Sequence, residues 1–138
     1  GRVEAINEDY KKGIDLAYLK VPGPVENYIE MNTDLPKKGQ AVFVIGNKLG
    51  FERSIDDGII SGLRPGPDEH VLIQTNAPMG PGSSGGPLLN DKGKLIGVAT
   101  FGYDEAQNLN FAMPPSAILE LIEKAPNAKV LIGVLNGI

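Results

Sequence analysis

The sequence contains no cysteine and a single histidine, His70. Without cysteine, the chain has no disulfide scaffold, no thiolate metal site and no cysteine nucleophile. With one histidine, a metal site built from several imidazoles is excluded as well. These absences remove whole classes of protein, but they do not fix the compartment, because exported proteins often lack disulfides too.

Basic charge, aromatic residues and long apolar runs are also scarce. The 138 residues include 13 Lys and Arg against 17 Asp and Glu, and aromatic residues make up 6%. Because no basic stripe is available to neutralise phosphates, we expect no nucleic-acid partner. No apolar run approaches the roughly 20 residues of a membrane-spanning helix, so we expect no membrane span.

Glycine and proline are abundant, with 18 and 11 residues, and they predict many short strands and turns. The segment 90–93 lies between two apolar runs and predicts a hairpin. The expected strands are residues 3–7, 14–21, 41–45, 58–63, 71–75, 88–89, 95–100 and 108–113, with a further short strand at 28–31.

One helix is expected near the C-terminal end. Pro114, Pro115 and Ser116 are typical of a helix start, apolar residues then recur on one face, and Pro126 ends the segment. Residues 130–135 are apolar and would form a sticky edge if exposed, so we expect them to pair with another segment. The sequence therefore predicts an all-β protein with a C-terminal helix.

The chemistry is concentrated in a glycine-rich loop, residues 80–87. Glycines adopt positive φ angles and turn backbone N–H groups inward, which builds an anion site. A serine in such a turn combines a nucleophile with an oxyanion hole, as acyl transfer requires. A phosphate-binding loop is disfavoured, because no lysine follows the glycines and no helix begins there. The residues alone leave a plain flexible turn open.

The sequence Gly82-Ser83-Ser84-Gly85-Gly86-Pro87-Leu88-Leu89, followed by residues 93–98, resembles the nucleophile loop and next hairpin of trypsin-like serine endopeptidases. The likeness is closest to the HtrA/Deg-like branch. Further segments resemble the same branch in the right order, namely residues 15–20, 44–47, 58–61, 73–77 and 110–114. This resemblance covers about residues 3 to 124. It implies a chymotrypsin-like antiparallel β-barrel, as the second barrel plus the last two strands of the first.

The resemblance also implies catalytic roles for individual residues. Ser84 matches the nucleophile, and the N–H groups of Gly82 and Ser84 match the oxyanion hole, with Ser83 between them. Asp15 matches the aspartate that orients the catalytic imidazole. Without that match, Asp15 is an ordinary residue opening a strand.

The same resemblance implies substrate contacts. Thr100, Phe101 and Gly102 match the strand that pairs with the substrate backbone, although plain barrel packing is the alternative for them. The loop from Ala77 to Pro81 and the strand around Asn110 and Phe111 would line the pocket for the substrate side chain that precedes the cleaved bond. These walls are apolar and carry no acidic residue, so we expect a preference for small or medium aliphatic residues over Lys or Arg.

The catalytic base is missing from this pattern. In the family, the triad histidine precedes the aspartate, whereas His70 follows Asp15 and stands beside acidic loop residues. We therefore expect His70 to be a solvated loop residue. Lys48 and Ser83 depart mildly from the branch's usual residues without removing a catalytic group. Because the chain begins at Gly1 and shows only two strands of the first barrel, we expect a missing N-terminal segment that carries the histidine.

That segment could belong to the same protein or to a partner chain, or the base could be naturally lost. We divide the chain into residues 1–24 as terminal strands of the first barrel, 25–125 as the second barrel with its helix, and 126–138 as a tail. The expected function is peptide hydrolysis through an acyl-enzyme on Ser84, with this chain alone inactive. The alternatives are a non-catalytic peptide-binding module and a small-anion-binding domain.

The expected partners are a peptide or unfolded-protein substrate and the missing N-terminal segment, and a homo-oligomer is left open. No metal or cofactor is implied. The resemblance favours the bacterial periplasm or cell envelope as the location.

Overall fold

The structure is a computed structural model, and it describes residues 2–5, 14, 16–20, 22–24, 26–47, 53–80, 82–104 and 109–124. For residues 2–5, 20, 101–104 and 109 the description covers the backbone alone. The elements in chain order are β1 (Arg2–Ala5), β2 (Tyr18–Lys20), β3 (Ala41–Gly46), β4 (Ser54–Pro65), η3 (Pro67–Glu69), β5 (Val71–Thr75), β6 (Pro87–Leu89), β7 (Leu95–Asp104), β8 (Leu109–Met113) and α1 (Pro115–Lys124).

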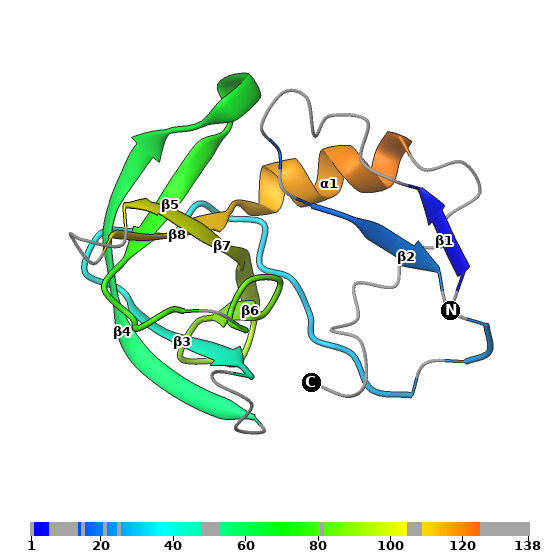
Figure 1. Cartoon of the computed structure of the whole chain (residues 1–138), viewed down its shortest axis with the longest axis horizontal. Coiled ribbons are helices and arrows are strands. Elements are labelled where there is room, and N and C mark those ends of the chain that lie inside the picture. The colour runs from blue at the N-terminus through cyan, green and yellow to red at the C-terminus, as the bar shows by residue number, and fades with distance from the viewer. Residues whose placement is uncertain are drawn as a thin grey trace.

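Six strands form a closed antiparallel barrel in the order β3-β4-β5-β8-β7-β6 (Figure 1). Strand β3 completes the ring, because it pairs with β4 along its whole length and with β6 through Phe43↔Leu89 and Val44↔Leu88. Closure gives every strand two neighbours and so removes the unpaired edges that promote aggregation. The predicted antiparallel β-barrel is confirmed.

The barrel interior is filled by alternate apolar residues, as the two-residue period of a strand requires. Val42 and Val44 point inward from β3 while Ala41 and Phe43 are exposed. The buried core cluster comprises Val42, Val44, Ile60, Ile73, Ala77, Leu88, Ile96, Ala99 and Ala112. Burial of a Val, Leu or Ile side chain stabilises a fold by about 1.5–3 kcal/mol, so the six larger side chains of this cluster contribute most to holding the barrel together.

Strand β4 is longer than the sequence predicted, since it begins at Ser54 and not at residue 58. Asp56 and Asp57 lie in the added half, and aspartate is a poor strand former. Pairing with β3 holds them in place, with Val44 opposite Asp56 and Phe43 opposite Asp57. Tertiary pairing therefore overrides local propensity in this half of β4.

Outside the barrel, β1 and β2 form a two-stranded antiparallel sheet on the side where α1 lies (Figure 1). The predicted pairing of two N-terminal strands is confirmed, although β2 begins at Tyr18 and not at residue 14. The expected strand at 28–31 is reduced to a single parallel bridge between Met31 and Leu95. Two backbone bonds flank it, from Leu95 N to Glu30 O and from Asn32 N to Leu95 O.

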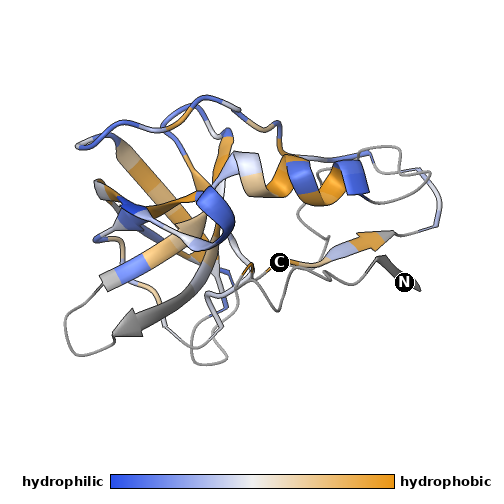
Figure 2. Cartoon of the chain, turned by 90° about the horizontal axis from the view of Figure 1, so that it is seen from above, coloured by the Kyte–Doolittle hydropathy of each residue, from blue (hydrophilic) through white to orange (hydrophobic). Residues whose placement is uncertain are grey.

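Helix α1 follows the last barrel strand, and the predicted helix is confirmed. Pro115 opens it, where a missing N–H costs nothing, and Ala117 and Ile118 are buried. Figure 2 shows hydrophobic and hydrophilic residues alternating along the helix. The apolar segment 130–135 and the proposed tail, 126–138, lie outside the described residues. Within the described part of the chain, no helix has both the length and the apolar character needed to cross a membrane.

Candidate active site

The Ser84 loop, residues 76–86, leaves the end of β5 and leads into β6. Its backbone is tied to itself by hydrogen bonds from Ser83 N to Gly80 O (2.9 Å) and from Gly86 N to Ser83 O (3.0 Å). It is tied to β7 by a reciprocal pair, from Gly85 N to Ala99 O and from Ala99 N to Gly86 O, both 2.8 Å. The loop is therefore anchored to the barrel beside the candidate nucleophile.

Glycine is needed in the Ser84 loop for two different reasons. Gly82 and Gly85 have φ angles of 94° and 86°, in the left-handed region that side chains with a Cβ avoid. Gly86 is needed for space, since a Cβ there would lie 2.1 Å from the carbonyl oxygen of Ile45. The end of β3 thus packs directly against the backbone of the loop.

The two adjacent serines have opposite environments. Ser83 is 1% exposed, and its Oγ accepts a 3.2 Å hydrogen bond from Gly80 N. Ser84 is exposed. Within the described part of the chain, the N–H groups of Gly82 and Ser84 donate to no carbonyl. The turn therefore combines an exposed serine with two N–H groups, two residues apart, that have no partner among the described residues, and acyl transfer needs such groups.

Asn110 and Ala77, both predicted as pocket residues, are brought together. Asn110 Nδ2 donates a 2.9 Å hydrogen bond to the carbonyl oxygen of Ala77. The methyl group of Ala77 is buried in the barrel core. Phe111, the neighbour of Asn110, faces the other way and packs with Leu72 and Met113.

The side chain of Thr75 also holds the backbone of Ala77, and the sequence analysis did not single out this residue. Its hydroxyl donates to Ile59 O at 2.7 Å and accepts from Ala77 N at 3.1 Å, in a side chain that is 1% exposed. A Cβ on Gly58 would lie 2.6 Å from Ala77 N, so this backbone is also closely packed from β4. No local signal marks Thr75, because the acceptor of its hydroxyl, Ile59 O, lies on β4.

Residues 100–102, the candidate substrate strand, continue β7 past the Ser84 loop. On the β6 side, pairing of β7 reaches Val98 opposite Pro87 and then the Ala99 bonds to Gly85 and Gly86. On the β8 side, Thr100 is opposite Phe111, and the register shifts before Asp104. Thr100 is 7% exposed, and for Phe101 and Gly102 only the backbone is described.

Asp15, the candidate triad aspartate, lies outside the described residues. Its neighbours Ile14 and Leu16 are described, and Ile14 is buried at 3% exposure. The role of Asp15 stays a prediction.

The expectation that His70 is a solvated loop residue is wrong. The exposed fraction of its side chain is 12%, and its ring lies between Ser116 and Glu120 of helix α1. The hydrogen bond to His70, followed by that to Lys124, lowers the pKa of Glu120 below its usual range. The turn that contains His70 is covered because helix α1, 46 to 50 residues away in sequence, packs onto it.

His70 and the Ser84 loop lie at opposite ends of β5. His70 immediately precedes Val71, whereas the loop begins after Thr75. Five strand residues span roughly 17 Å. His70 is therefore separated from the start of the Ser84 loop by the length of β5.

Comparisons with known proteins agree with this geometry. The family described as the trypsin-like peptidase domain matches residues 1–98. A protein of Ectopseudomonas mendocina, named as a DegP-like periplasmic serine endoprotease, is 35% identical over 117 residues, which cover 80% of this chain and 25% of that protein.

Two solved structures share the fold. The serine endoprotease from Yersinia pestis matches with a TM-score of 0.61 and 31% identity, over 70% of this chain and 35% of that chain. A variant of the HtrA-type protease AlgW, solved with a tripeptide, matches with a TM-score of 0.62 and 30% identity, over 80% of this chain and 37% of that chain. These matches confirm the predicted chymotrypsin-like barrel.

The chain spans 26%, 28% and 29% of the lengths of the first three curated relatives that it matches. The family match nevertheless covers well over half of the chain, and the relatives and solved structures point to one branch of it. The chain therefore belongs to the trypsin-like peptidase domain family, in its HtrA/Deg-like branch.

Proposed function

We propose that this chain carries the nucleophile of an HtrA-like serine endopeptidase, with Ser84 attacking the carbonyl carbon of a peptide bond. The observation that carries the proposal is the exposed Ser84 hydroxyl beside the unpaired N–H groups of Gly82 and Ser84. In a loop held by hydrogen bonds on both sides, these donors need little reorganisation to stabilise a developing oxyanion. Removing one such donor typically costs about 10²–10³ in kcat.

The reaction needs a base that the described residues do not place near Ser84. In the proposed mechanism, an imidazole from an upstream segment takes the Ser84 proton, and Asp15 holds that imidazole in the required tautomer. The acyl-enzyme on Ser84 forms as the leaving amine takes the proton, and water then hydrolyses it. Residues 1–24 would belong to a first barrel completed by that segment, and residues 25–125 to the second barrel. This chain alone would then be inactive.

The proposed substrate is a peptide or an unfolded protein that adds a strand to β7. Residues 100–102 support this, because they continue β7 directly after Ala99, whose backbone bonds to Gly85 and Gly86 of the Ser84 loop. An extended peptide on that edge would be held by main-chain hydrogen bonds. The solved relative with a tripeptide is consistent with such a ligand class.

The loop from Ala77 and the side chain of Asn110 would line the pocket for the substrate side chain that precedes the cleaved bond. Because Asn110 is neutral and its amide is engaged by Ala77 O, the wall supplies no negative charge for Lys or Arg. We infer a preference for small or medium aliphatic residues. A periplasmic or envelope location and a homo-oligomer complete the proposal, the former supported by the DegP-like relative.

Fluorophosphonate labelling tests the nucleophile. We expect the full chain to label weakly or not at all, and to label fast once the upstream segment of its parent protein is present. Ser84→Ala should abolish labelling, whereas Ser61→Ala, on β4, should not. A complete, folded parent protein that fails to label would overturn the enzyme proposal.

That failure would favour the second candidate, a non-catalytic peptide-binding module. One observation supports it, since the only histidine of the chain lies at the far end of β5 from Ser84. This candidate predicts peptide binding that survives Ser84→Ala and is lost in Phe101→Pro, because proline removes a backbone N–H from the β7 edge. Measuring the binding of a fluorescent extended peptide by anisotropy separates the two.

A further inference from the structure

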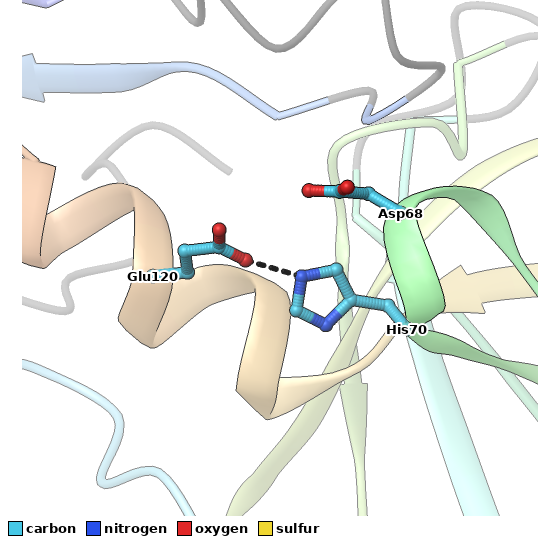
Figure 3. Close-up of side chains that lie close together, drawn as sticks. All are labelled: Asp68, His70 and Glu120. Atoms are coloured by element: carbon cyan, nitrogen blue, oxygen red, sulfur yellow. Dashed lines mark hydrogen bonds and ion pairs between the residues drawn. The ribbon is translucent and has the colours of Figure 1, made fainter.

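Three possible metal ligands meet where helix α1 packs against the turn between β4 and β5. They are the carboxylates of Asp68 and Glu120 and the imidazole of His70, and one ligand atom from each lies within 4.8 Å of the other two. Figure 3 shows the two carboxylates and the ring facing a common space, two of the residues from the turn and one from the helix. Sequence reasoning expected no metal site, because the chain has a single histidine.

We propose that Asp68, His70 and Glu120 bind one divalent transition-metal ion, with Zn²⁺ the best-suited candidate. One imidazole and two carboxylates are ligands that Zn²⁺ takes, with water left for the fourth position. Two carboxylate charges also balance the charge of the dication. This site is independent of the proposed peptidase function.

The geometry around His70 supports this assignment. Nδ1 lies 3.0 Å from Ser116 Oγ, and Nε2 lies 2.5 Å from Glu120 Oε2. In the proposed site, Nδ1–H donates to Ser116 Oγ, and the Nε2 lone pair and Glu120 Oε2 both face the ion; without the ion, a proton on Nε2 joins the ring to the carboxylate. Metal-bound histidines usually have this arrangement, with the second ring nitrogen donating to an oxygen.

The other ligands are placed to close on an ion. Glu120 is held through Oε1 by Lys124 Nζ at 3.2 Å, so that Oε2 is the oxygen directed at His70. Asp68 is exposed. Tetrahedral Zn²⁺ needs ligand atoms about 3.4 Å apart, so Nε2 and Oε2 would separate slightly and Asp68 would move inward.

The turn itself has an unfavourable backbone. Asp68 and Glu69 have φ angles of 51° and 64°, in the region that L residues with a Cβ rarely adopt. An ion bound by Asp68 and His70 would hold this turn, and Glu120 would join it to α1 across 50 residues of sequence. The ion would therefore cross-link the β4–β5 turn to the helix.

The first test uses the full 138-residue chain without an affinity tag, after chelation and dialysis. Zn²⁺ titration by calorimetry should give one ion per chain, and thermal unfolding should show Tm rising by about 4 °C at tenfold over Kd. Since His70 is the only histidine, ¹⁵N NMR of its ring is unambiguous. Zn²⁺ should shift Nε2 and leave Nδ1 protonated.

Matched variants complete the test. Asp68→Asn and Glu120→Gln keep size and shape, and each should weaken Zn²⁺ affinity about tenfold or more. Glu123→Gln, an exposed carboxylate on the same helix, should leave it unchanged. An Nε2 resonance that stays protonated in excess Zn²⁺ would overturn the proposal and leave an imidazolium ion pair with Glu120. Equal weakening by Glu123→Gln would overturn it as well, and the NMR result stands even where a variant fails to fold.

Discussion

Asn110 on β8 donates a side-chain hydrogen bond of 2.9 Å to the carbonyl oxygen of Ala77, at the start of the Ser84 loop. The backbone N–H of Ala77 is held in turn by the Thr75 hydroxyl. Both polar groups of one residue are thus satisfied by side chains of the barrel wall. This fixes the path by which the chain leaves β5 and approaches Ser84.

Replacing Asn110 by alanine removes the bond to Ala77 O. Because the carbonyl is part-buried, we expect the free energy of unfolding to fall by about 1 kcal/mol. Urea unfolding of the full chain measures this, with Asn27→Ala at an exposed position as the control. Equal stability of the two variants would mean that the Asn110 bond does not hold the loop.

Thr75 offers a sharper test, because its hydroxyl can be removed without changing shape. Thr75→Val leaves the N–H of buried Ala77 without its partner, so we expect a loss of about 2 kcal/mol. Thr75→Ser keeps the hydroxyl, so this variant should keep most of the stability that Thr75→Val loses. The midpoints of urea unfolding measure both variants. A valine variant as stable as the serine variant would contradict the role of the Thr75 hydroxyl.

The glycines of the Ser84 loop predict a graded series. Gly80→Ala meets nothing within 4 Å and should be nearly neutral, whereas Gly85→Ala should cost about 1–2 kcal/mol because of its positive φ. Gly86→Ala places a Cβ 2.1 Å from Ile45 O and should cost about 3 kcal/mol or more. Thermal unfolding of the three variants checks the order, and a tolerated Gly86→Ala would show that the loop is not packed against β3.

A pH-dependent contact joins the connector before the barrel to the hairpin between β6 and β7. Lys94 donates to the Glu30 carboxylate and lowers the pKa of Glu30 below its usual range. A lowered pKa means that the contact favours the folded state above the ordinary glutamate range and is lost as pH falls below it.

We therefore expect Lys94→Gln to raise the pKa of Glu30 towards its ordinary value, whereas Lys92→Gln should have little effect. Carbon-13 NMR titration of the Glu30 carboxyl measures both. High salt should shrink the difference, since both side chains are exposed. An unchanged pKa in Lys94→Gln would contradict the contact.

The strands, the helix and the Ser84 loop were predictable because their signals are local. The continuous apolar, β-branched run of residues 41–45 predicts strand β3, and Pro115 followed by apolar residues at helical spacing predicts α1. The glycines of residues 80–87 mark a loop with positive φ angles. The first residues of β4 were not predicted, because Asp56 and Asp57 have low strand propensity and only pairing with β3 holds them in a strand.

By itself, the sequence determined the barrel's strands, the family and the segment that presents Ser84, because strand period, turn chemistry and ordered motifs are properties of neighbouring residues. Only the tertiary structure decided that His70 is enclosed by Ser116 and Glu120, and that Asn110 reaches Ala77. These pairs are separated by 33 to 50 residues. Contacts of that kind depend on barrel closure and helix docking, and no local pattern encodes which distant side chains then meet.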